Sequence, residues 1–206
     1  MAIKSDREYR MGIEFRAVEQ TEEEAPNYIV EGYATTFNDP YVLYEYQGEK
    51  YSEQIDRDAL QEADMSDVIM LYNHEGMVFA RMSNGTLEVS PNERGLYVRA
   101  DLSKTQASRE MYENIKAGLV TQMSWAFTVD EDSYDENTRT RSIMKIRKVY
   151  DVSAVSIPAN PNTDISARAY WDGVIAEEKR RRDRERELEE KRQAIRDMIL
   201  QGRSAK

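Results

Sequence analysis

The chain has 206 residues, of which 40% are hydrophobic and 33% charged, and it carries a net charge of −10. This length fits one domain of ordinary size with an appendage, and no run approaches the roughly 20 apolar residues that a membrane-spanning helix needs. The absence of cysteine excludes disulfides, thiol nucleophiles and thiolate metal sites.

Charge is distributed unevenly along the chain. Residues 176–206 hold 11 of the 29 basic side chains but only 8 of the 39 acidic ones, so this end is positive and the rest is strongly negative. A negative body argues against nucleic-acid binding through phosphate contacts. The first residues also lack the apolar segment of a secretory signal. We therefore expect a cytoplasmic protein that binds neither nucleic acid nor a membrane.

Apolar and polar residues alternate in the first part of the chain, which predicts strands. Residues 9–37 contain two alternating runs separated around Pro26, which indicates an opening hairpin. Residues 41–51 repeat the pattern with several tyrosines across a turn at Gly48, which indicates a second hairpin or flap. These runs predict antiparallel pairing near the amino terminus.

The next segment is predicted to bring a histidine to the end of a buried strand. Asp56 is placed to cap a short helix over residues 57–64. The apolar run from Val68 to Tyr72 predicts a buried strand that ends at His74. Functional side chains are common at such strand ends.

Residues 86–102 predict another antiparallel pair, and a helix follows it. Thr105 or Ser103 is placed to cap this helix, and Gly118 stands where the helix closes. Strands are then predicted over three ranges, with an exposed acidic loop over residues 130–140. The three strand ranges are 120–129, 142–149 and 152–157.

A change of composition near residue 170 marks the expected domain boundary. We expect residues 1–170 to form an α+β domain that is mostly antiparallel β with two helices. Residues 171–206 are dominated by Glu, Lys and Arg and predict a charged helical tail. Its apolar patch is confined to Ile195, Met198, Ile199 and Leu200.

His74 is the single histidine of the chain. A neighbouring glutamate suggests a zinc protease, but the second histidine of the H-E-x-x-H motif does not exist, so that class of enzyme is excluded. Hydrolysis assisted by histidine must then use His74 as the general base, because imidazole transfers protons near neutral pH. The alternative is a structural histidine whose ring is satisfied at a strand end.

Ser124 is the candidate nucleophile. It lies in a predicted strand between large apolar residues, where a polar side chain is hard to explain as surface. The G-x-S-x-G elbow of α/β-hydrolases is absent, and the S-x-x-K pattern that begins at Ser142 falls on a predicted strand instead of a helix start. The alternative is a strand serine bonded to a neighbour.

Asp151 is an acidic residue in an otherwise apolar strand. A buried carboxylate is costly unless it is paired, and orienting an imidazole would supply that pairing. The alternative is an edge strand on which this side chain faces water. The sequence thus offers a base, a nucleophile and an orienting acid, in three separate predicted elements.

The order and context of these residues resemble the prohead serine proteases of tailed bacteriophages, a family whose fold is similar to the herpesvirus capsid maturation proteases. The resemblance covers about residues 13–168. Its fragments are, in order, Gly32-Tyr-Ala-Thr-Thr-Phe37-Asn, Ile55 to Ala59, Asn73-His74, Phe79-Ala-Arg81, Gly85-Thr-Leu87, Gly95-Leu-Tyr-Val98, Gly118-Leu-Val-Thr-Gln-Met-Ser124-Trp-Ala-Phe127, Asp151-Val-Ser-Ala-Val155 and Pro158-Ala-Asn-Pro161.

The resemblance implies a serine endopeptidase with a β-barrel-like, herpesvirus-protease-like domain and no cofactor or metal. His74 and Ser124 match the family's histidine and serine. The family places an acidic residue, often Glu, in the strand of Asp151, whereas the herpesvirus relatives use a second histidine that this chain lacks. Arg81 matches a recurrent arginine, whose role in binding the oxyanion or in the fold stays open.

The implied biology is cleavage of the scaffold segment of the major capsid protein, and of the protease itself, inside an assembling procapsid in the host cytoplasm. Homo-oligomerisation is left open. Two alternatives remain from other classes of protein. One is a non-catalytic capsid-assembly scaffold that keeps the protease fold, and the other is a binding module in which His74 is structural.

Overall fold

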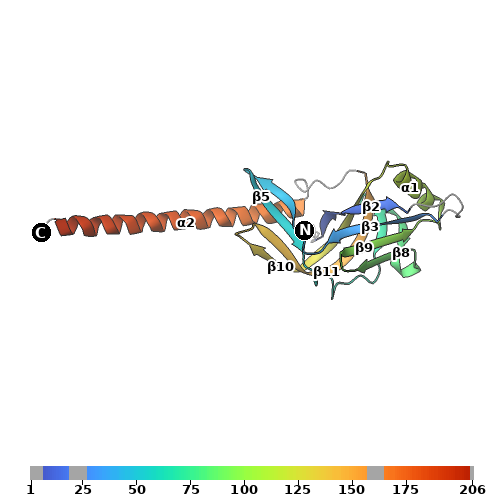
Figure 1. Cartoon of the computed structure of the whole chain (residues 1–206), viewed down its shortest axis with the longest axis horizontal. Coiled ribbons are helices and arrows are strands. Elements are labelled where there is room, and N and C mark those ends of the chain that lie inside the picture. Colours follow the sequence, from blue (N-terminus) through green and yellow to red (C-terminus); the bar gives the residue numbers. More distant parts are fainter. Residues whose placement is uncertain (1–6, 19–26, 157–164, 205–206) are drawn as a thin grey trace, which may run out of the picture. The chain divides into compact units, whose positions relative to one another are not determined.

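The computed structural model describes residues 7–18, 27–156 and 165–204, and the chain divides into two compact units, residues 1–167 and 168–206. The elements appear in Figure 1 and are, in chain order, β1 (Glu8–Met11), β2 (Glu14–Ala17), β3 (Ile29–Thr36), β4 (Tyr41–Tyr46), β5 (Glu49–Ile55), β6 (Ile69–Tyr72), β7 (Glu75–Arg81), the 3₁₀ turn η1 (Met82–Asn84), β8 (Leu87–Pro91), β9 (Gly95–Asp101), α1 (Gln106–Lys116), β10 (Gln122–Asp135), β11 (Thr140–Val155) and α2 (Ile165–Ser204).

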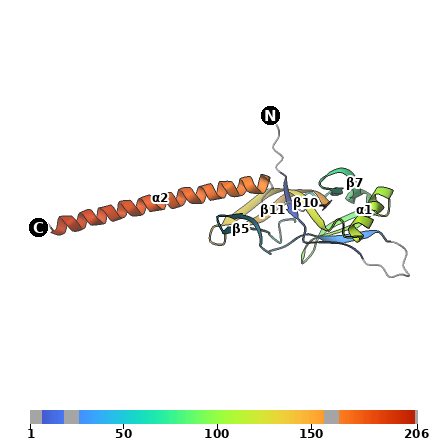
Figure 2. The ribbon, with the colours of Figure 1, turned by 90° about the horizontal axis from the view of Figure 1, so that it is seen from above.

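The described residues of the first unit form two sheets. Seven strands form one sheet with the order β1-β10-β11-β5-β4, in which β6 pairs with β11 and β7 pairs with β6. Four strands form the other sheet, in the order β2-β3-β9-β8. The long strands β10 and β11 pair along their length and run side by side through this unit (Figure 2). They are the frame on which the shorter strands are arranged.

β11 has two parallel neighbours along the side that β10 does not occupy. Residues Thr140 to Ile143 pair with β5, and residues Asp151 to Ala154 pair with β6. All other strand pairs are antiparallel. Because β6 lies beside the carboxyl end of β11, the turn that follows β6 comes close to that end of the sheet.

The core of the first unit takes side chains from both sheets and from α1. Val30 and Leu96 come from the small sheet, while Phe127 and Val149 come from the large one, and all four are almost completely buried. Trp125 stacks on Phe127 with ring centroids 4.1 Å apart. Strand alternation, which points every second side chain inward, explains this distribution.

Helix α1 begins and ends where the sequence predicted. Thr105 is the N-cap, and its side chain accepts a hydrogen bond from the Ser108 amide at 3.0 Å. Met111, Tyr112 and Ile115 form the buried face. Gly118 follows with a φ of 73°, a left-handed conformation that glycine adopts without a steric penalty.

The α+β class and the predicted hairpins are confirmed, since β2 pairs with β3, β4 with β5 and β8 with β9. The barrel-like expectation is not confirmed. The path of the large sheet ends at β1 and β4, and no pairing joins these two strands within the described residues. The acidic loop expected over residues 130–140 is instead mostly strand, because β10 continues to Asp135, although it is largely exposed as expected.

The helix predicted over residues 57–64 is wrong. The segment forms successive turns, with the Asp56 carboxylate accepting from the Asp58 amide at 2.9 Å. Its backbone is bound to β11, because Ile146 donates to the Ala59 carbonyl at 2.8 Å and Asp64 donates to the Arg147 carbonyl at 2.9 Å. These tertiary hydrogen bonds replace those of a helix too short to be stable alone.

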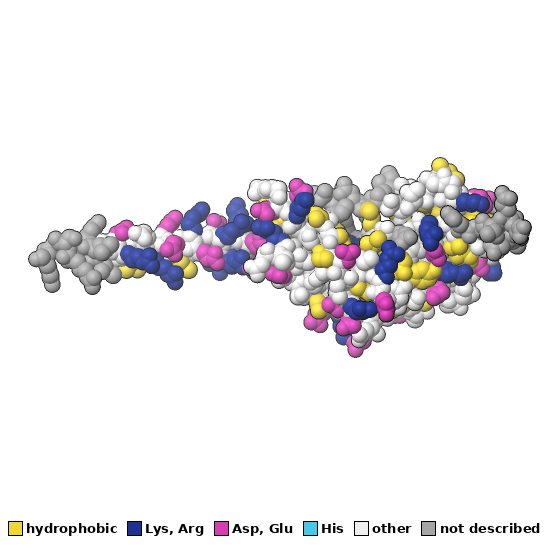
Figure 3. All heavy atoms as spheres, in the orientation of Figure 1, with side chains coloured by type: hydrophobic (Ala, Val, Ile, Leu, Met, Phe, Trp, Pro, Cys, Tyr) yellow, Lys and Arg dark blue, Asp and Glu magenta, His cyan; other side chains and the backbone are white. Residues whose placement is uncertain are grey.

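Within the described residues, the second unit consists of α2 from residue 168 onward. Lys and Arg side chains are interspersed with Asp and Glu along its surface (Figure 3). Arg181 lies 3.8 Å from Glu185 and Arg186 lies 3.4 Å from Asp183, in exposed pairs one helical turn apart. Among the described residues, no helix is both long enough and apolar enough to cross a membrane.

Candidate active site

Ser124 lies in the middle strand of a three-strand segment, between β1 and β11. It is completely buried, and its Cα partners are Met11 on β1 and Ser153 on β11. Side chains directly opposite each other in a sheet share a face, and so do residues two apart in one strand. Ser124, Ser153 and Asp151 therefore lie on one face of the sheet.

His74 is presented by a tight turn between β6 and β7. Tyr72 pairs with Glu75, which leaves Asn73 and His74 as the two loop residues. Their φ values are 51° and 63°, the positive values that a type I′ hairpin turn requires at both central positions. The Asn73 amide donates to the Ala154 carbonyl at 2.9 Å, which fastens the turn to the end of β11.

The three residues that the sequence singled out meet at this point. His74 Nδ1 lies 2.6 Å from Asp151 Oδ1, and His74 Nε2 lies 2.8 Å from Ser124 Oγ. The imidazole therefore bridges a carboxylate and a hydroxyl through its two nitrogens. With Nδ1 protonated toward Asp151, Nε2 has a free lone pair directed at the serine.

Asp151 is almost completely buried and accepts two hydrogen bonds. One comes from His74, and the other comes from the Ser153 hydroxyl, which donates to Asp151 Oδ1 at 2.6 Å. A buried carboxylate without such partners would be strongly unfavourable. Both bonds use the same oxygen, so they fix the side chain in the position that orients the imidazole.

The geometry of Ser124, His74 and Asp151 is that of a nucleophile, a general base and an orienting acid. The family of caudovirus prohead serine proteases matches residues 13–173. The chain belongs to this family. It is 27% identical over 147 residues to the prohead protease of Enterobacteria phage HK97. The matched residues make up 71% of this chain and 62% of that relative.

The chain thus spans less than two thirds of the length of the curated relative that it matches. No solved structure matches this chain. The expected likeness to herpesvirus capsid proteases therefore stays a prediction. Family membership agrees with the sequence resemblance, and the matched range contains His74, Ser124 and Asp151.

Arg81, the recurrent arginine of the family resemblance, makes no hydrogen bond or ion pair with the three residues, and its partner is another carboxylate. It ends β7, and its guanidinium donates to the Asp67 carboxylate at 2.6 Å in a largely exposed ion pair. Ser142 also lies elsewhere, on β11, where it accepts from the Gln54 amide at 2.8 Å. The S-x-x-K pattern therefore has the strand context that the sequence predicted for it.

Sequence reasoning missed two neighbours of the three site residues. Ser153 follows Asp151 by two residues in a strand, so the shared face was available as a signal. Tyr9 packs its ring edge against His74, with ring centroids 4.7 Å apart and an interplanar angle of 69°. Nothing in the sequence pairs residue 9 with residue 74.

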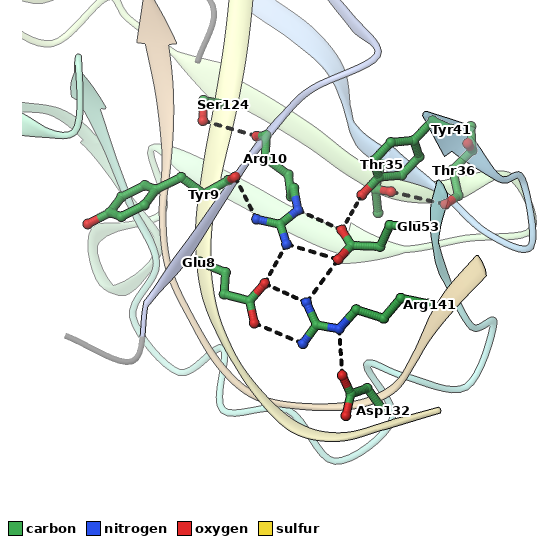
Figure 4. Close-up of polar contacts among 10 residues, drawn as sticks. All are labelled: Glu8, Tyr9, Arg10, Thr35, Thr36, Tyr41, Glu53, Ser124, Asp132 and Arg141. Atoms are coloured by element: carbon green, nitrogen blue, oxygen red, sulfur yellow. Dashed lines mark hydrogen bonds and ion pairs between the residues drawn. The ribbon is translucent and has the colours of Figure 1, made fainter. Parts of the chain in front are cut away.

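A buried ion-pair network on β1, β5 and β11 was also missed. Arg10 donates from Nε to Glu53 Oε1 at 2.6 Å and from Nη2 to Oε2 at 2.9 Å (Figure 4). Arg141 donates to the same carboxylate at 3.0 Å, and Tyr41 donates its hydroxyl to it at 2.7 Å. Glu53 has no exposed surface, because it stands at an inward position of β5 between the buried residues Tyr51 and Ile55.

The charges of this network support one another. Burial acts to raise the pKa of Glu53, but the guanidinium groups of Arg10 and Arg141 outweigh it, so this pKa is lowered. Burial likewise acts to lower the pKa of Arg10, and the Glu53 carboxylate raises it well above its usual value. All three groups are therefore ionised at neutral pH.

No cluster of three or more metal-ligating side chains occurs in the part of the chain that the structure describes. The polar groups around Ser124 are instead a hydroxyl, an imidazole and a carboxylate in hydrogen-bond contact. Such an arrangement can activate a hydroxyl for attack on a carbonyl carbon.

Proposed function

We propose that this chain is the serine endopeptidase of phage head maturation, with Ser124 as nucleophile, His74 as general base and Asp151 as the orienting acid. The observation that carries the proposal is the position of the His74 ring, with one nitrogen on Ser124 and the other on Asp151. Membership of the prohead serine protease family supports the reaction class.

The proposed reaction is acyl transfer in two halves. Ser124 Oγ forms a bond to the carbonyl carbon of the scissile peptide while its proton passes to His74 Nε2. His74 then gives this proton to the leaving nitrogen as the C–N bond breaks. Water reverses the sequence, releases the acyl group and restores the serine, with His74 again accepting and returning the proton.

Asp151 acts through the imidazole. Its carboxylate holds the proton of His74 on Nδ1 and stabilises the charged ring that forms after Ser124 is deprotonated. Ser153 keeps the carboxylate in place. Backbone N–H groups bind the oxyanion, as proposed for this class of reaction.

The substrates are the scaffold segment of the major capsid protein and the protease itself, cleaved inside the assembling procapsid in the host cytoplasm. Residues 1–170 act as the protease domain, and the charged helix over residues 171–206 directs the enzyme to its place of action. The reaction needs no cofactor or metal. Homo-oligomerisation is not required by this scheme.

One observation favours the competing function of a non-catalytic assembly protein. Ser124 has no exposed surface in this structure, as expected for a serine that only fills the core. Co-expression with the phage's own major capsid protein distinguishes the two functions. Intact mass of both proteins over time should show loss of the scaffold segment and truncation of the protease.

Ser124→Ala should abolish both cleavages, while the matched strand variant Ser142→Ala, whose side chain contacts Gln54, should keep them. Stable masses for the wild-type proteins would support the assembly function and contradict the protease. Failure of a fluorophosphonate to modify the wild-type chain would favour the alternative of a binding module.

A further inference from the structure

The strand that buries Ser124 belongs to the amino-terminal segment of the same chain. β1 has only four residues and pairs with β10 along the edge of the large sheet, with Met11 opposite Ser124. The Ser124 hydroxyl donates to the main-chain carbonyl oxygen of Arg10 at 3.0 Å (Figure 4). A peptide carbonyl is the group that a serine nucleophile attacks, so β1 occupies the place of a peptide substrate.

The Arg10 side chain is enclosed by charged and aromatic groups of the domain. Arg10 is almost completely buried, and its guanidinium binds both oxygens of Glu53 (Figure 4). Tyr41 and Arg141 hold this carboxylate from β4 and β11, and the Phe127 ring centroid lies 5.7 Å from the guanidinium carbon. A bidentate carboxylate in a water-excluded pocket selects arginine over neutral or acidic side chains.

The other residues of β1 are also held by the body of the domain. Glu8 receives two hydrogen bonds from Arg141, at 2.8 and 3.0 Å, while the Tyr9 ring packs edge-on against His74. Glu8, Tyr9 and Arg10 are therefore bound as an extended strand. Glu8 and Arg10 are held by ion pairs, and Tyr9 packs against the imidazole. This is how strand addition achieves affinity through the main chain and specificity through side-chain pockets.

From these contacts we infer that β1 is an intramolecular occupant of the peptide-binding channel, and that the enzyme's substrates are extended segments with arginine on the amino side of the cleaved bond. The inference rests on the proposed function of Ser124. An incoming strand in the register of β1 presents the carbonyl of its arginine to Ser124 and places the side chain on Glu53. Glu53 is then the specificity-determining residue.

The occupied state is inactive toward other peptides. Ser124 is covered, and a hydroxyl has one hydrogen, so donating it to the Arg10 carbonyl withdraws it from His74 Nε2. Release of β1 exposes the serine and returns its hydrogen bond to the imidazole. The residues that hold β1 are the same ones that bind the substrate.

Peptide binding to the full-length chain tests the channel without relying on catalysis. The probe is a fluorescent peptide with the sequence of residues 8–13, beside the same peptide with glutamine in place of its arginine. Arg10→Gln releases the guanidinium from Glu53, so this variant should bind the arginine peptide about tenfold more tightly than wild type does. It should also bind the arginine peptide about tenfold more tightly than the glutamine peptide.

Two further variants keep this test decisive. Arg16→Gln on β2 removes the same charge from an ion pair with Glu31 of β3 and should behave as wild type. Glu8→Gln loosens β1 at a partly exposed residue, so it should give a smaller gain in binding with the same preference for arginine, even if Arg10→Gln does not fold. Equal binding of the two peptides in the variants that fold would overturn the inference.

Fluorophosphonate labelling separates this inference from the proposed function. Labelling of Ser124 should be about tenfold faster in Arg10→Gln than in wild type and should be slowed by the arginine peptide. If arginine-selective binding is found without labelling of any variant, the channel stands and the nucleophile is wrong. If labelling is equal in wild type and Arg10→Gln and no peptide competes, the nucleophile stands and β1 is only a structural strand.

Discussion

The backbone of His74 lies in the left-handed region, with a φ of 63° that few residues other than glycine adopt. Such a conformation costs about 1–3 kcal/mol and persists where the surroundings fix it. Here the Asn73 amide is bound to Ala154, and the Asn73 side chain accepts from the Ser156 amide at 3.1 Å. The strain sits in the turn that carries the proposed base.

The proposed base and nucleophile should act as one unit. Ser124→Ala and His74→Ala should each lower kcat/KM by about 10⁴-fold or more, and the double variant should be no slower than either, because each removes the same proton transfer. Steady-state kinetics on a scaffold-segment peptide measures this, with circular dichroism as the check on folding. A double variant far slower than both single ones would show that the two side chains act independently.

Asp151 is expected to raise kcat by fixing the tautomer of His74. Asp151→Asn should lower kcat by about 10²–10⁴-fold, because an amide allows the imidazole to place its proton on Nε2, where it faces Ser124. Asp67→Asn, which alters an exposed carboxylate paired with Arg81, is the matched control and should keep full activity. Full activity in Asp151→Asn would remove this residue from the proposed site.

The pH dependence should report one imidazole. His74 accepts a proton only in its neutral form, so kcat/KM should rise as the pH increases through the range from about 5 to 8. The chain has no other histidine to contribute to this rise. A rate that does not change across this range would contradict a histidine base.

The candidate residues could be found in the sequence because each is unusual where it stands. His74 is the single histidine, and Ser124 and Asp151 interrupt apolar strands. Tyr9 and Glu53 could not be found, because their roles depend on which strands lie opposite one another. Strand order is set by long-range pairing, which local patterns do not encode.

At the scale of elements, periodicity predicted the hairpins well. It failed for a short helix and for the short strand β1, whose places depend on tertiary contacts. The pairs β4–β5 and β8–β9 follow from alternation and turn residues. The helix over residues 57–64 failed because its backbone groups bind β11 instead. Alternation alone places the residues of β1 in the opening hairpin, whereas this strand joins the other sheet beside β10.

The network around Glu53 should make stability depend on pH. The pKa of Glu53 is lowered in the folded chain, so its contribution to stability is present above its unfolded pKa of about 4.3 and is lost as the pH falls through the folded value. Glu53→Gln leaves Arg10 and Arg141 without their buried partner, so it should lower the free energy of unfolding at pH 7 by about 3–5 kcal/mol.

Urea unfolding at pH 7 and at pH 3 measures this effect. The difference between wild type and Glu53→Gln should be smaller at pH 3, because this pH lies below the unfolded pKa of about 4.3, where protonation of Glu53 stabilises the unfolded wild-type chain. Glu49→Gln on the same strand removes an exposed partner of Arg139 and should change stability by less than about 1 kcal/mol at either pH. An equal loss in the two variants would mean that the network contributes no more than a surface pair.

At the scale of the whole molecule, the charged helix is expected to direct the enzyme and not to take part in the chemistry. Removing residues 177–206 should leave peptide cleavage nearly unchanged and abolish packaging of the enzyme into procapsids. The exposed apolar side chains Ile195 and Met198 are the proposed contact, so changing both to serine should have the same effect on packaging.

Leu188→Ser, which alters another exposed apolar residue of α2, is the control and should be packaged normally. Western blotting of purified procapsids measures packaging, and a fluorogenic peptide measures cleavage. Normal packaging of the truncated chain would end the targeting role, and an inactive truncated chain would show that α2 supports the catalytic unit.

The identity of the nucleophile is tested most directly by mapping a fluorophosphonate adduct. Trypsin releases residues 117–139 as one peptide that holds Ser124 and Ser133, and fragmentation separates the two. The account predicts an adduct on Ser124 that is retained in Ser133→Ala and lost in both Ser124→Ala and His74→Ala. An adduct that persists in Ser124→Ala, or an unmodified Ser124 in protein that cleaves its substrate, would contradict it.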